Sequence, residues 1–169
     1  MPWPSVRAVA LVTSELLIEF PAETVYDFLS QLANHQRMGG HRFRLNTVAP
    51  DRLGATIVIR GPLGIHRTVQ TTITCLRPAR GVGGTATIGR QTVAHVHWTI
   101  HAAGDRSHVT LTATIVRTGM VDRLLLAAGG RRWLARSFHR VLTLLSATIR
   151  TAAPDATLPV NAPNPDQKR

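Results

Sequence analysis

The sequence contains a single cysteine, Cys75, so no internal disulfide framework can form. Aromatic residues make up only 5% of the 169 residues. Long apolar runs are also missing, because Glu15 and Glu19 interrupt the first apolar segment and arginines divide the last one. These absences disfavour a disulfide-stapled domain, a signal peptide and a membrane-spanning helix. We therefore expect one domain in a reducing compartment, the cytoplasm, with no cofactor.

Acidic residues are also few: nine Asp and Glu stand against 20 Lys and Arg, a net charge of +11. A strong positive charge favours phosphate-rich partners. However, Lys168 is the single lysine, and the arginines are spread along the chain without a basic block, a zinc knuckle or a stacking pair of aromatics. This distribution argues against a nucleic-acid partner, and it leaves open a transient contact with an anionic membrane surface.

Periodicity predicts a strand, two short helices and then a β-meander. Residues 11–20 mostly alternate as a strand, Pro21 and Glu23 mark a helix start, and 33–38 continue as a second short helix before Gly39. The Gly-rich run 80–84 leads into a strand, so we expect a flexible turn there and no phosphate-binding loop. Turn residues separate the predicted meander strands, which lie near 42–49, 54–60, 65–76, 84–89, 92–102 and 107–117.

The last predicted hairpin has a testable register. A two-residue turn at Gly104 and Asp105 places Trp98 opposite Leu111. Apolar and polar residues then separate onto opposite faces, as expected for a sheet covered on one side. The predicted inner face carries Val96, Trp98, Ile100, Val109, Leu111 and Ala113, and the outer face carries His95, His97, Thr99, His101, His108, Thr110, Thr112 and Thr114.

Residues 121–150 predict a long C-terminal helix, and Gly129 with Gly130 predicts a break within it. Beyond it, residues 151–169 are rich in Pro, Asn and Asp, which predicts a disordered tail. We expect an N-terminal extension at 1–10 and a ligand-binding domain at 11–150. The apolar stripe of the helix consists of Leu134, Phe138, Val141, Leu142, Leu145 and Ile149.

Two stretches of the sequence carry a family resemblance. The run IEFPAETVYDFLSQLANHQRM at 18–38 and the hairpin VHWTIHAAGDRSHVTLTATI at 96–115 resemble the SRPBCC superfamily, which includes START, polyketide-cyclase-like and pollen-allergen-like domains. The resemblance spans about 11–150 and implies an α+β helix-grip fold, a curved antiparallel sheet of about seven strands wrapped around a long C-terminal helix. It also implies a cavity between sheet and helix that binds a hydrophobic small molecule.

The resemblance places the candidate ligand-binding residues on the inner sheet face and the helix stripe. Small inward residues, among them Thr85 and Ala86, favour empty space beneath the sheet. Arg67 lies on the same predicted strand face as Val69 and Ile73. Its side chain would therefore point towards the cavity and pair with a ligand carboxylate or phenolate. A position at the rim of the cavity is the alternative. The candidates are Phe43, Leu45, Ile57, Ile59, Arg67, Val69, Ile73, Trp98, Leu111, Leu134 and Phe138.

Catalytic and metal motifs are absent from the sequence. Cys75 lacks a predicted His partner, and neither a G-x-S-x-G nor an H-E-x-x-H pattern occurs. The histidines at 95, 97, 101 and 108 share the predicted outer face without a carboxylate or thiolate at matched spacing, so we assign no metal site. Three functions remain open: carriage of a lipid-, quinone- or polyketide-like molecule, a cyclase or aromatase activity, and an interaction protein with a filled cavity. A monomer and a homodimer are both compatible with the sequence.

Overall fold

The structure is a computed structural model that describes residues 8–39, 43–51, 53–60 and 64–152. The predicted tail at 151–169 and the extension at 1–10 lie mostly outside these residues. Seven strands, four α-helices and one π-helical turn follow one another along the described chain. They are β1 (Ala10–Ile18), α1 (Ala22–Leu29), α2 (Leu32–Gly39), β2 (Phe43–Val48), β3 (Gly54–Arg60), β4 (His66–Arg77), β5 (Gly81–Ile88), β6 (Thr92–Ala103), β7 (Arg106–Arg117), α3 (Met120–Leu125), the π-helical turn η3 (Leu126–Gly130) and α4 (Arg131–Ala152).

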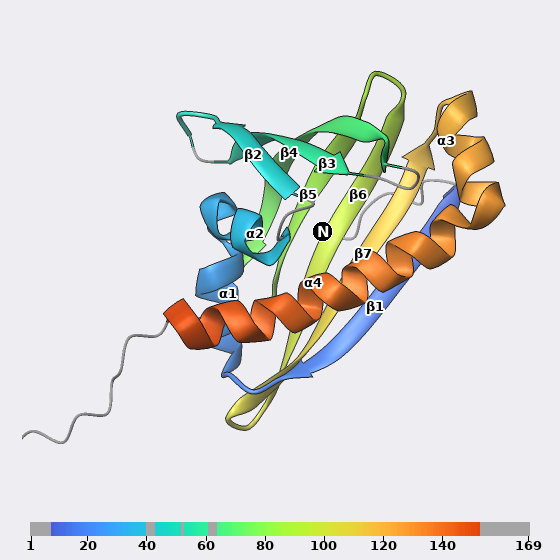
Figure 1. Cartoon of the computed structure of the whole chain (residues 1–169). Coiled ribbons are helices and arrows are strands. Elements are labelled where there is room, and N and C mark those ends of the chain that lie inside the picture. Colours follow the sequence, from blue (N-terminus) through green and yellow to red (C-terminus); the bar gives the residue numbers. More distant parts are fainter. Residues whose placement is uncertain (1–7, 40–42, 52, 61–63, 153–169) are drawn as a thin grey trace, which may run out of the picture.

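All seven strands form one antiparallel sheet in the order β1-β7-β6-β5-β4-β3-β2. Figure 1 shows α4 crossing the concave face of this curved sheet, with α1 and α2 beside the C-terminal half of α4. Helix α4 packs along β1 and against α2, and α2 also contacts β2. The predicted helix-grip architecture is therefore confirmed. No helix in the described part of the chain is long and apolar enough to span a membrane.

The β6–β7 hairpin has the predicted register. Trp98 pairs with Leu111, and His101 pairs with His108. Trp98 and Leu111 are buried against α4 and its neighbours, whereas His101 and His108 are exposed. The separation of apolar and polar residues along each strand therefore decides which face of the sheet meets the helix.

The Gly-rich run is part of a strand, which corrects the expectation of a flexible turn. β5 begins at Gly81, and its neighbours leave no room for side chains at two of its positions. A Cβ atom at Gly81 would overlap the carbonyl oxygen of Trp98, and one at Gly84 would overlap that of Thr72. Glycine is required here because adjacent backbones approach closely, not because the chain turns.

The predicted break in the C-terminal helix is confirmed at Gly129. This residue has a φ of 100°, in the left-handed region that favours glycine, and Ala128 has a ψ of 23°. The regular helix α4 then begins at Arg131. The break separates α3, a short helix without a buried residue, from the long helix that covers the sheet.

Candidate functional site

A cavity of about 250 Å³ lies between the concave sheet face and α4. Its walls come from β3 to β7, from α2 and from the first half of α4. Trp98 and Ala94, four residues apart in β6, both line it, so the cavity extends about 13 Å along this strand. The site is therefore an elongated space beneath the centre of the sheet.

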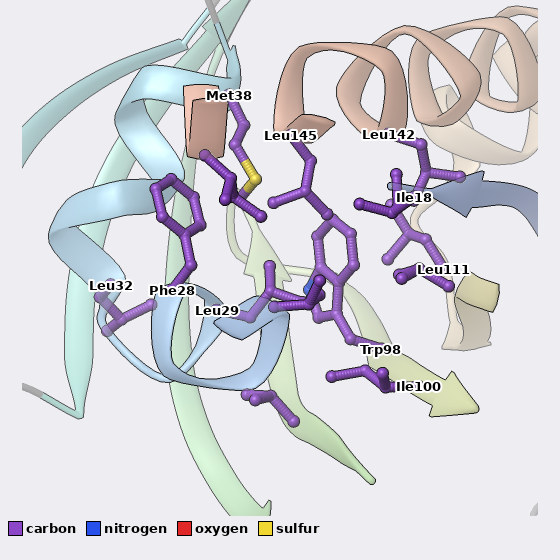
Figure 2. Close-up of a cluster of buried hydrophobic side chains, with 14 of the residues drawn as sticks. Ile18, Phe28, Leu29, Leu32, Met38, Trp98, Ile100, Leu111, Leu142 and Leu145 are labelled. Atoms are coloured by element: carbon purple, nitrogen blue, oxygen red, sulfur yellow. The ribbon is translucent and has the colours of Figure 1, made fainter. Parts of the chain in front are cut away.

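The cavity exists because the buried side chains form two separate clusters. The main cluster joins α1, α2 and the C-terminal half of α4 to β6 and β7, and Figure 2 shows its members Met38, Leu145 and Trp98 gathered between these elements. The second cluster is small and comprises Ala10, Ala94 and Ile115, with Leu126 and Leu134 packed on it. The cavity lining draws on both clusters, so it occupies the interval that neither of them fills.

The cavity wall is mainly aliphatic and aromatic. Small residues keep it open, since Gly84, Ala86, Ala94 and Ala113 contribute little or no side-chain volume on the inner face. Thr85, which we expected among them, lies on the outer face, where its hydroxyl is 3.4 Å from Nδ1 of His95. The polar residues in the wall are His35, Arg60, Thr71, Thr72, Ser137 and Arg140, so no carboxylate of a described residue lines the cavity.

His35 is the buried titratable residue of the wall. Helix α2 carries it, and its Nε2 lies 2.7 Å from the carbonyl oxygen of Leu29. Its ring meets that of Trp98 edge-on, with the centroids 6.1 Å apart and the planes at 79°. Burial lowers the pKa of His35 below its usual 6.5, although the hydrogen bond to Leu29 acts in the opposite direction. The imidazole is therefore neutral at neutral pH.

The structure places the sequence-predicted site residues as follows. Leu45 packs against the main core cluster rather than the cavity. Phe43 pairs with Ile59 through the β2–β3 ladder, and its side chain lies outside the described residues. The remaining apolar candidates all lie on the cavity: Ile57, Ile59, Val69, Ile73, Trp98, Leu111, Leu134 and Phe138. Their contact with a ligand stays a prediction.

Arg67 has a protein partner, and its contact with a ligand stays a prediction. Its Nη2 lies 2.8 Å from Oδ1 of Asp122 in α3, and the Thr92 hydroxyl donates to Oδ2 of the same carboxylate. Arg67 is absent from the cavity wall. The alternation of β4 places Arg67 on the same face as Val69. However, Arg67 lies at the start of β4, next to α3, and Asp122 of α3 supplies the carboxylate that it contacts. This ion pair ties α3 to the sheet.

Sequence reasoning missed the contribution of α2. Leu32, His35 and Met38 all line the cavity from this helix. Their spacing of three residues places them on one helical face, and this spacing was the available signal. Trp133, one of the first residues of α4, was missed as well.

Several histidines lie on the outer sheet face, among them His95 and His97. In the described ranges, no three His, Cys, Asp or Glu residues gather closely enough to hold a metal ion. Burial, together with the nearby Arg77 and His95, lowers the pKa of His97. A second hollow is lined by residues that include Cys75, Arg77 and His97.

Comparisons with known proteins identify the architecture. No family model and no curated protein sequence matches the chain. Among solved structures, a protein of Thermus thermophilus superposes with a TM-score of 0.69 at 18% identity, covering 86% of this chain and all of its own. A START superfamily protein of Mycobacterium smegmatis gives 0.63 at 9% identity, with 84% and 98% covered. The Zhui aromatase/cyclase of a Streptomyces species gives 0.64 at 14% identity, with 87% and 97% covered. Likeness at this identity defines fold alone, and the chain has the helix-grip fold that these START and aromatase/cyclase structures share.

Proposed function

We propose that this protein binds and carries an apolar small molecule, such as a lipid, quinone or polyketide, in the cavity between its sheet and α4. The observation that supports this proposal is the cavity itself, an elongated space walled mainly by apolar side chains. Apolar cavities of this kind favour ligands that leave water, since each buried CH₂ contributes about 0.8 kcal/mol. The half-buried lone thiol, Cys75, fits a reducing compartment such as the cytoplasm.

A cyclase or aromatase activity is the second candidate, and His35 is the residue that favours it. A neutral imidazole beside Trp98 offers one acceptor atom to a reacting chain. General acid–base chemistry commonly uses a second group of different pKa. The other charged residues of the described wall are Arg60 and Arg140, which are exposed and offer hydrogen-bond donors only. We therefore rank carriage first.

Native mass spectrometry tests carriage directly. We expect the purified protein to show a mass above that of the chain, and we expect organic extraction to remove the excess. The emptied protein should then bind N-phenylnaphthylamine and change the fluorescence of Trp98, which lines the cavity. Trp98→Phe separates this signal from that of Trp133. A protein that holds no apolar compound, and whose emission stays unchanged at saturating probe, would contradict carriage.

A carrier needs a place to exchange its ligand, and we propose that α3 docks on an anionic membrane surface. Met120, Val121 and Leu124 are exposed by 81%, 59% and 69%, and no residue of α3 is buried. Exposed arginines at 123, 131 and 132 adjoin this apolar face. The carboxylate of α3, Asp122, is engaged by Arg67 and Thr92. Apolar side chains flanked by cations match a bilayer that contains acidic lipids.

Co-sedimentation with vesicles tests the docking face. We expect binding to phosphatidylcholine vesicles that contain phosphatidylglycerol, weaker binding without it, and a loss at high salt because ions screen the attraction. Leu124→Glu should reduce the binding severalfold. Leu76→Glu is the matched control. Leu76 is 45% exposed and lies near the end of β4, whereas Arg67, which contacts α3, lies near its start. Equal losses from both variants would contradict docking through α3.

A further inference from the structure

The hydrogen bond of His35 determines which of its nitrogens can act as an acceptor. A backbone carbonyl can only accept, so the Nε2 atom beside the Leu29 oxygen carries the proton. In a neutral imidazole the other nitrogen, Nδ1, then has a lone pair and no proton. No described residue of the protein is recorded as a hydrogen-bond donor to Nδ1. The structure therefore presents an acceptor of defined tautomer.

The surroundings of His35 hold its imidazole ring in the wall of the cavity. His35 belongs to the cavity wall and keeps partial exposure although the fold encloses it. Its ring is held from two sides, by the carbonyl of Leu29 and by the ring of Trp98. Immobilised polar groups in an apolar wall recognise a ligand at little cost in conformational entropy.

The other polar side chains of the wall differ from His35 in character. The hydroxyls of Thr71 and Ser137 rotate and can either donate or accept, and the arginines at 60 and 140 only donate. Among the described side chains of the wall, His35 therefore differs in that its Nδ1 atom can only accept a hydrogen bond. A ligand that offers it a donor avoids leaving a buried acceptor unpaired, which would be unfavourable.

We propose that the carried molecule has a hydroxyl group, phenolic or alcoholic, that donates a hydrogen bond to Nδ1 of His35, with its apolar body extending along β6 towards Ala94. The inference rests on the proposed function, since it names a chemical feature of the ligand for the same cavity. It makes His35 the residue that selects hydroxylated molecules over plain hydrocarbons of similar size.

Calorimetric titration of the extracted protein with naphthol and with naphthalene tests this selection. The two probes share one ring system and differ in a single hydroxyl group. A purely apolar cavity would favour naphthalene, because an unpaired hydroxyl loses its hydrogen bonds to water. With His35 as acceptor we expect naphthol to bind more tightly, by about five- to tenfold.

Two variants and one spectroscopic measurement assign the preference to His35. His35→Phe retains an aromatic ring beside Trp98 but no acceptor, and it should reverse the preference towards naphthalene. His35→Gln supplies both a donor and an acceptor, and it should retain part of the preference for naphthol. In wild-type protein with nitrogen-labelled histidine, the Nδ1 resonance of His35 should move upfield with naphthol and stay in place with naphthalene, a readout that requires no variant to fold.

The outcomes separate this inference from the proposed function. If both probes bind but wild type favours naphthalene, or if naphthol leaves the Nδ1 resonance unchanged, the inference is overturned and carriage stands. If neither probe binds the extracted protein, the proposed function is overturned and the inference with it. A preference for naphthol that His35→Phe abolishes supports both.

Discussion

Replacing Leu145 by alanine is expected to lower the free energy of unfolding by about 2–5 kcal/mol. Leu145 is fully buried in the main core cluster, and Figure 2 shows it pointing from α4 towards the ring of Trp98. Removing its side chain deletes apolar contacts and leaves a hole that rigid neighbours on the helices and the sheet cannot fill. Urea unfolding at neutral pH, followed by circular dichroism, measures the loss.

The adjacent Leu144→Ala variant provides the matched control. Leu144 lies in the same helix and lines the cavity, so its side chain already faces unfilled space. Fewer packing contacts are lost there, and we expect a decrease below about 2 kcal/mol. Equal losses at the two positions would mean that the cavity is filled by protein atoms in solution, which would favour the interaction-protein alternative.

Filling the cavity from the sheet is expected to weaken ligand binding strongly without unfolding the protein. Ala86 lies on the inner face of β5, opposite Ala94, and both line the cavity. Ala86→Phe places a phenyl group in the space assigned to the ligand. We expect the dissociation constant for N-phenylnaphthylamine to rise by about tenfold or more, equivalent to about 1.4 kcal/mol, with an unchanged or raised melting temperature.

Two further variants make the cavity-filling test specific. Thr87→Phe adds the same ring to the same strand on the opposite face, since successive side chains alternate, and it should leave binding unchanged. Ala86→Leu should weaken binding to an intermediate degree because it fills less space. Normal probe binding by a folded Ala86→Phe protein would show that the probe binds elsewhere and would contradict the assigned site.

The architecture was predictable because local patterns and turn chemistry agree. In the β6–β7 hairpin, the two-residue turn at Gly104 determines the register, and strict alternation then separates Trp98 from His97. The break at Gly129 was predictable for the same reason, since glycine disfavours a helix interior. Such features depend on residues close together in sequence.

The errors arose where distant segments decide the outcome. Gly81 and Gly84 carry no local sign that the backbones of Trp98 and Thr72 approach them. Likewise, nothing within β4 shows that Asp122 of α3 will lie beside Arg67. The acceptor role of His35 depends on the Leu29 carbonyl and on Trp98, which only the assembled fold brings to its ring. Apolar site residues were predictable as a class, whereas the polar residue that would select a ligand was not.

The pairing of β1 with β7 has a consequence for the order of assembly. Ala10, at the start of β1, pairs with Ile115 near the end of β7, and the N–H of Val9 donates to the carbonyl oxygen of Ile115. Closing so long a loop is entropically unfavourable before the contacts that reward it have formed, and folding dominated by distant pairings is slow. During synthesis, β1 must therefore remain without its native neighbour until β7 has left the ribosome. Until then, the apolar residues of β1 that the folded protein buries, Val12 and Ile18 among them, are exposed to solvent and can promote aggregation.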